Sequence, residues 1–136
     1  MKAFVLERYG QSLRAVDMPV PEPGPRQVLV RMVASGVNHA DERTRVGEFK
    51  AVFRLDLPKV MGGELSGEVV AVGDQVTEFA VGDQVYGYTG VVGMGTWAEI
   101  VAVDAETLAP APRGIPLARA ARSEEHTSEL QSLVII

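Results

Sequence analysis

The chain has 136 residues, of which 46% are hydrophobic and 23% charged, with no cysteine and a formal net charge of -5 at pH 7. This length and composition fit one globular domain with an apolar core, and no apolar run approaches the roughly 20 residues that span a membrane, so we expect a cytoplasmic protein. The lack of cysteine excludes disulfides and cysteine-containing zinc sites, and the acidic balance without a Lys/Arg cluster argues against a nucleic-acid partner.

The first part of the chain predicts three strands. Weak alternation predicts one strand over 2–7 and another over 13–18. Prolines at alternate positions over 19–25 lack backbone donors and favour a stiff extended connector. The clearest strand lies over 26–34, where hydrophobic side chains occupy both faces.

A short helix is predicted over 38–46. Asn38 suits the N-cap position, and Asp41 follows three residues later, where a carboxylate can meet the free backbone amides of the first turn. Gly47 is a suitable C-terminal stop.

The later part of the chain predicts further short strands separated by Gly, Pro and Asp. Over 65–72 a strand is interrupted by Gly67, which indicates a bulge or sharp bend. Short strands follow over 85–88 and 107–110, with a longer alternating strand over 96–103 between them. About six such strands with one or two short helices predict a mainly β fold, a small and partly open β-barrel.

Several ordered motifs resemble one known family. They are the segments 36–41 (Gly-Val-Asn-His-Ala-Asp), 62–64 (Gly-Gly-Glu), 81–87 (Val-Gly-Asp-Gln-Val-Tyr-Gly) and 95–99 (Gly-Thr-Trp-Ala-Glu). Residues 1–121 resemble the N-terminal, GroES-like catalytic domain of the medium-chain dehydrogenase/reductase superfamily. The resemblance implies a GroES-like barrel.

Within that superfamily, the resemblance is to the zinc-free quinone oxidoreductase and enoyl reductase-like branch. The zinc-dependent branch carries a cysteine where this chain has Asn38 and a histidine where it has Gly63. The resemblance therefore implies no bound metal, use of NADPH, and hydride transfer to a quinone or an activated enone. It also implies that the full-length protein is a homodimer.

The resemblance suggests roles for five residues. Asn38 would be both catalytic and cofactor-binding, because its amide can orient the nicotinamide ribose or a substrate carbonyl. Asp41 is a second catalytic candidate, although its placement favours a structural role at the start of the helix. His39 would contact the cofactor or remain solvated, and Glu64 and Tyr86 would line the substrate cleft, although Tyr86, like Trp97, could also be a simple core aromatic.

The end of the chain differs in character from the rest. The segment 122–132 resembles a translated sequencing adapter, so we expect 122–136 to be an artefactual or non-native tail. Its uncharged end, 133–136, is predicted to be unpaired and prone to aggregate. Family members carry a Rossmann domain after the barrel, and none is recognisable here, so the chain is expected to be a fragment that is inactive alone.

Two alternatives to a zinc-free reductase stay open. The barrel could be a stand-alone binding or scaffold module of the co-chaperonin type, which would give a ring-sized mass in solution. It could also come from a zinc alcohol dehydrogenase, which would purify with stoichiometric zinc.

Overall fold

The computed structural model describes residues 1–52, 54–89, 95–121 and 132–135, and β-strands dominate this part of the chain. The strands are β1 (Lys2–Leu6), β2 (Arg14–Asp17), β3 (Gln27–Val37), β4 (Lys59–Val60), β5 (Glu64–Val72), β6 (Gln84–Tyr88), β7 (Ile100–Asp104), β8 (Leu108–Pro110) and β9 (Ser132–Ile135). The helices are α1 (His39–Arg45) and α2 (Leu117–Ala120), with a single 3-10 turn, η1 (Ala105–Thr107). The predicted mainly β architecture with two short helices is confirmed for the described residues.

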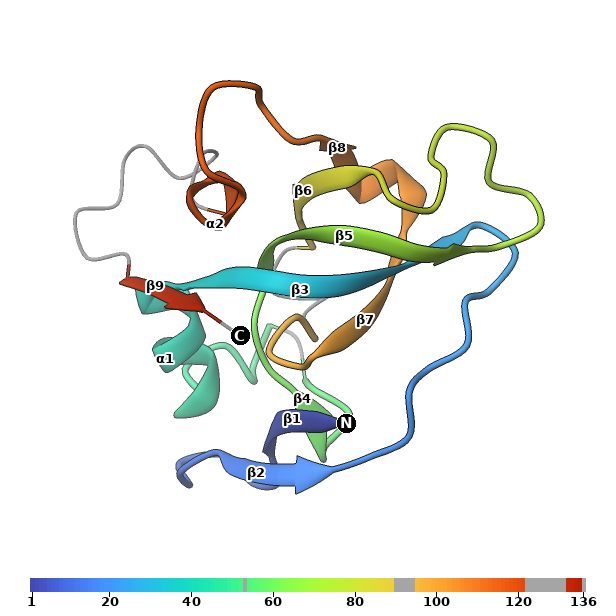
Figure 1. Cartoon of the computed structure of the whole chain (residues 1–136). Helices are drawn as coiled ribbons and strands as arrows, with labels where there is room; N and C mark the ends of the chain where they lie inside the picture. Colours follow the sequence, from blue (N-terminus) through green and yellow to red (C-terminus); the bar gives the residue numbers. More distant parts are fainter. Residues whose placement is uncertain (53, 90–94, 122–131, 136) are drawn as a thin grey trace.

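The strands form two open sheets (Figure 1). The smaller sheet has the order β2-β1-β4, and the larger has the order β7-β3-β5-β6-β8, with β9 also paired to β3. The paired strands are antiparallel. An isolated bridge between Ala3 and Ala98 joins the smaller sheet to the segment before β7, and the Phe4 N–H donates to the Trp97 carbonyl oxygen at 2.9 Å. This arrangement is the expected partly open, GroES-like barrel.

The long β3–β5 pair is the centre of the larger sheet, and a glycine interrupts it. A Cβ at Gly67 would lie only 2.2 Å from the carbonyl oxygen of Arg31 on the facing strand. The register of the pair shifts between Met32 and Ala34, directly opposite Gly67. The predicted irregularity at Gly67 is confirmed, and its cause is the close approach of two backbones.

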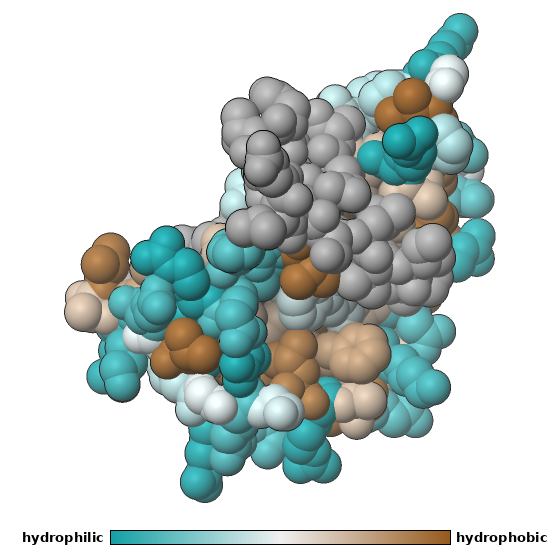
Figure 2. Space-filling view, turned by 90° about the vertical axis from the view of Figure 1, so that its left-hand side faces the viewer, coloured by the Kyte–Doolittle hydropathy of each residue, from teal (hydrophilic) through white to brown (hydrophobic). Residues whose placement is uncertain are grey.

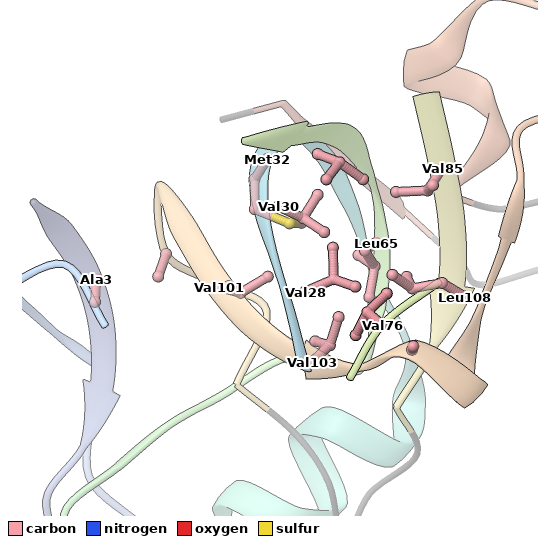
Figure 3. Close-up of a cluster of buried hydrophobic side chains, with 13 residues drawn as sticks. Ala3, Val28, Val30, Met32, Leu65, Val76, Val85, Val101, Val103 and Leu108 are labelled. Carbon is pink, nitrogen blue, oxygen red and sulfur yellow. The ribbon is translucent and has the colours of Figure 1, made fainter. Parts of the chain in front are cut away.

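The main core lies where the larger sheet curls over itself, and Figure 3 shows its side chains pointing toward one another from several strands. Val28, Val30, Leu65 and Val85 are each fully buried there. A smaller cluster forms between the sheets around Leu6 and Met61. The alternation that predicts the strands thus also selects the core, since every second side chain of a strand points to the same face.

Two of the predicted boundaries need correction. The strand predicted to end at Ala34 continues to Val37, so Ser35 and Gly36 are strand residues before the helix rather than a loop. The strand predicted from Thr96 begins only at Ile100. The segment before it leaves the ladder because it hydrogen-bonds toward the smaller sheet, with the Trp97 N–H donating to the Met61 carbonyl oxygen.

The helix prediction is confirmed: α1 is capped by Asn38 and ends before Gly47, whose φ of 88° suits a helix stop.

The prediction of an unpaired chain end is wrong. Strand β9 pairs with Ala34–Val37 of β3. Ala34 has Ser66 of β5 on one side and Ile135 of β9 on the other. On this edge of β3, strand β7 pairs only as far as Arg31, and β9 pairs with the residues beyond it. Backbone groups at such an edge need partners, and β9 supplies them.

Candidate functional site

The end of β3 and the beginning of β5 bring together Asn38 and Glu64, two residues singled out in the sequence. The Asn38 Nδ2 amide donates to Glu64 Oε1 at 2.8 Å. The Glu64 side chain lies in the interior, with only 1% of its surface exposed. The pairing follows from topology: Asn38 follows the last residue of β3, and Glu64 opens the antiparallel neighbour β5. A buried carboxylate requires such polar contacts, because burial without them is costly.

Asp41 is tied to the same group through the backbone. Its Oδ2 accepts a hydrogen bond from the Asn38 backbone N–H at 2.8 Å, and its own N–H donates to the Asn38 carbonyl oxygen at 3.0 Å. Burial raises the pKa of the Asp41 carboxyl, and the hydrogen bond from Asn38 opposes that rise. Asp41 can therefore hold a proton at a higher pH than an ordinary aspartic acid.

One polar atom of the site has no partner in the structure. Asn38 Oδ1 is buried and has no hydrogen bond of its own within the described residues: the Asp41 N–H of the capping box faces the Asn38 side chain but donates to the Asn38 backbone carbonyl oxygen. Leaving a buried acceptor unsatisfied costs about 1–3 kcal/mol. The atom is suited to a donor on a bound molecule, such as a ribose hydroxyl or an amide, so the residues present fit the nicotinamide half of a cofactor.

A buried network of polar side chains, which the sequence did not predict, hydrogen-bonds to the backbone of Glu64 and so holds the Asn38–Glu64 pair in place. Ser35 Oγ donates to the Glu64 carbonyl oxygen at 2.6 Å and lies 3.1 Å from Thr96 Oγ1. Trp97 Nε1 donates to Ser35 Oγ at 3.0 Å. A single hydroxyl in a mostly apolar strand is the only sequence signal for Ser35, and it does not identify the partners.

His39 and Tyr86 lie outside this hydrogen-bonded group. His39 is the first residue of α1 and is exposed. Tyr86 is half-buried on β6, opposite Ser66. The structure does not bring either side chain into hydrogen-bond contact with Asn38, so their site roles stay predictions.

The positions of the zinc ligands of the zinc-dependent branch hold other residues in this chain. Where the zinc-dependent branch carries ligands, this chain has the Asn38 amide and Gly63, which has no side chain. Within the described residues, no group of three His, Cys, Asp or Glu side chains is close enough to hold a metal ion.

A pocket of about 350 Å³ opens next to Asp41. Helix α1 forms one wall, and Trp97, Met61 and Val37 form the apolar side. Its volume falls in the range of small-molecule sites. On the face shown in Figure 2, hydrophobic residues form separate patches among hydrophilic ones, which is ordinary for a protein surface. None of the helices in the described part of the chain has the length and apolar character of a membrane-crossing segment.

Residues 24–113 match the family model of the alcohol dehydrogenase GroES-like domain. A quinone oxidoreductase of Pseudomonas aeruginosa is 42% identical over 105 residues, covering 77% of this chain and 31% of the relative. An NADPH-dependent alkenal/one oxidoreductase of Arabidopsis thaliana, a chloroplastic protein, is 37% identical over 134 residues, covering 89% of this chain and 33% of the relative. The chain thus spans about a third of the length of these relatives. Other relatives are named alcohol dehydrogenases.

A solved structure supports the same assignment. The crystal structure of an alcohol dehydrogenase superfamily protein from Novosphingobium aromaticivorans superimposes with a TM-score of 0.82 at 41% identity, covering 89% of this chain and 37% of that one. Together with the matched family model, the likeness extends over the barrel that carries Asn38 and Glu64. This chain belongs to the alcohol dehydrogenase GroES-like domain family, within the medium-chain dehydrogenase/reductase superfamily.

Proposed function

We propose that this chain supplies the substrate-cleft domain of a zinc-independent, NADPH-dependent oxidoreductase that reduces a quinone or an activated enone. The observation that carries the proposal is the Asn38 side chain. It takes the place of a metal ligand of the zinc branch, its Nδ2 is held by Glu64, and its Oδ1 is buried without a donor. The names of the relatives, a quinone oxidoreductase and an alkenal/one oxidoreductase, support the substrate class.

Bound NADPH would supply the hydride. The chain's own residues would orient the cofactor and the substrate and would protonate the substrate oxygen. Asn38 Oδ1 would accept a hydrogen bond from the cofactor or substrate, with Glu64 fixing the amide through Nδ2. Asp41, whose pKa burial raises, would serve as the proton source for the oxygen on which negative charge develops. His39 would contact the cofactor from the exposed start of α1, and Tyr86 would line the cleft.

The whole protein would then be longer than this chain. Residues 1–121 would form the catalytic domain, a Rossmann domain elsewhere in the protein would hold most of NADPH, and 122–136 would be a non-native tail. We further propose a homodimer for the whole protein. A cytoplasmic location stays a prediction, since a chloroplastic protein and a mitochondrial one are among the named relatives.

The test uses the complete protein that contains these residues. NADPH consumption with 1,4-naphthoquinone should be readily measurable, and Asn38→Ala should lower kcat/KM at least tenfold. The matched control is Val81→Ala, at an exposed position away from the site, which should leave kcat/KM unchanged. Stoichiometric zinc in the active protein, with activity lost to a chelator, would contradict the proposal and favour a zinc alcohol dehydrogenase.

A separate measurement tests whether the main NADPH site lies outside this chain. The 136-residue chain alone should bind NADPH too weakly for calorimetry to detect at micromolar concentrations. Micromolar binding by the isolated chain would show that the main cofactor site lies within these residues.

A further inference from the structure

The pocket next to Asp41 has a fixed aromatic wall. The Trp97 indole N–H donates to Ser35 Oγ at 3.0 Å, which anchors the ring from inside the barrel. Gly62 leaves room for the ring, because a Cβ there would lie 2.4 Å from Trp97 Cδ1. Gly62 also has a φ of 100°, which disfavours any other residue. The indole is therefore held in one position rather than free to swing into the pocket.

The rest of the apolar wall comes from separate parts of the chain. Leu13 follows the turn after β1, Val37 ends β3, and Met61 follows β4 and is fully buried. Arg45 ties the Leu13 segment to α1, because its Nη1 donates to the Gln11 carbonyl oxygen at 2.7 Å. The pocket is thus closed on several sides by tethered elements, as expected for a preformed small-molecule site.

The charges around the pocket are internally balanced. Arg45 Nη2 and Nε donate to the two carboxylate oxygens of Glu42 at 2.5 and 2.8 Å. The hydrogen bond from Arg45 holds the pKa of Glu42 below its usual value, so the pair stays ionised and mutually neutralised. With its donors directed at Glu42 and Gln11, Arg45 does not present a free fork to a phosphate or carboxylate. The remaining acid, Asp41, repels an anion when it is ionised.

We propose that this pocket binds the ring of an uncharged, planar carbonyl compound against Trp97, with the carbonyl oxygen directed toward Asp41. The inference rests on the proposed function, which requires a quinone or enone substrate, and adds a subsite for the ring of that substrate. Asp41 connects this pocket to the Asn38–Glu64 pair, because it lines the pocket and accepts the Asn38 backbone N–H. The apolar wall favours a ring, the Glu42–Arg45 pair leaves no unpaired cation to attract an anion, and Asp41 lines the same pocket as Trp97 and donates a hydrogen bond when it is protonated.

The pocket carries its own reporter, because Trp97 is the only tryptophan of the chain. The 136-residue chain, without NADPH, is titrated with 1,4-naphthoquinone and, separately, with 1-naphthoate, a ring of similar size that bears a carboxylate. Equilibrium dialysis of the unaltered chain with each compound measures binding independently of fluorescence. We expect saturable quenching by the quinone, with a Kd at least tenfold lower than that of the naphthoate.

Two variants decide whether the quinone occupies this pocket. Ser12 lines it and Gln11 does not, although both are exposed and adjacent in sequence. Ser12→Phe should fill part of the cavity and weaken quinone binding at least tenfold, whereas Gln11→Phe should change Kd less than twofold. Circular dichroism checks that both variants fold.

Three results would overturn the proposal: quenching that rises linearly like that of free N-acetyltryptophanamide together with no binding in dialysis, an equal effect of both variants, or tighter binding of the naphthoate. If Ser12→Phe does not fold, dialysis of the unaltered chain and the preference between the two compounds still decide the matter. Because no cofactor is present, failure of this binding test leaves the NADPH assay of the complete protein as an independent test of the proposed function.

Discussion

The two ends of the β3–β5 pair bury different kinds of side chain. On one side of the Gly67 irregularity, the strands contribute Val28, Val30 and Val69, all fully buried and apolar. On the other side the buried side chains include Ser35 and Glu64, joined by Thr96 from the segment before β7. The apolar end stabilises the fold by removing hydrocarbon from water, whereas the polar end needs hydrogen bonds for its buried groups and leaves Asn38 Oδ1 and Ser66 Oγ without one. A fold that keeps such a polar end is holding particular groups in place at a cost in stability.

The largest expected effect comes from weakening the main apolar core, to which Leu65 contributes from the Glu64 side of Gly67. Leu65→Ala removes a fully buried side chain of the main core and should lower the free energy of unfolding by about 2–5 kcal/mol. Urea denaturation followed by circular dichroism measures the change. Val81→Ala, at a largely exposed position, should lie within about 0.5 kcal/mol of the unaltered chain. Equal losses for the two variants would contradict the assignment of the core.

At the polar end, the Asn38 amide donates to Glu64. Asn38→Asp replaces this donor with a second carboxyl group next to that of Glu64. Like charges at this distance raise the pKa of the pair in the folded state above its unfolded value. The stability of the variant should therefore be largest below about pH 4, where carboxyls of the unfolded chain are protonated, and should fall as the pH rises. At neutral pH we expect a loss of about 1–3 kcal/mol.

The matched control for that experiment is Asn38→Ala, which removes the amide without adding a charge. Its stability loss should depend less on pH than that of Asn38→Asp. Identical pH profiles of urea midpoints for the two variants would show that the aspartate does not interact with Glu64.

A smaller loss of stability should follow from removing the hydrogen bond between Trp97 and Ser35 at the polar end. Trp97→Phe removes the indole N–H that donates to Ser35 Oγ, and we expect a loss of about 1 kcal/mol. Because the two residues share this bond, combining Trp97→Phe with Ser35→Ala should cost less than the sum of the single changes. A double-mutant cycle by urea denaturation tests this, and strictly additive losses would mean that the bond contributes nothing.

The smallest effect concerns the titration of Asp41. Its pKa is raised in the folded state by burial, so the unfolded chain releases this proton at a lower pH than the folded chain does. Stability of the unaltered chain should consequently fall relative to Asp41→Asn as the pH rises from below 3.8 through the raised pKa, and then stay constant. Urea midpoints across this window give the comparison. A relative gain for the unaltered chain would mean that the pKa is lowered instead.

The contrast between the two ends also explains which predictions succeeded. Alternating apolar residues and glycine turns predicted the strands of the apolar end and the irregularity at Gly67, because these signals are local. The N-cap role of Asn38 was predicted for the same reason. The extension of β3 to Val37 was missed because Ser35 and Gly36 do not look like strand residues, and only pairing with a distant strand makes them so.

The sequence by itself determined the class of fold, the capped helix and the family, since each depends on residues close together in the chain or on ordered motifs. The tertiary structure alone decided that Asn38 meets Glu64, that Trp97 reaches Ser35, and that a pocket lies between α1 and the Leu13 segment. These contacts join residues 26 and 62 positions apart. Contacts at such separation depend on how the sheets curl and pair, and no local pattern encodes that geometry.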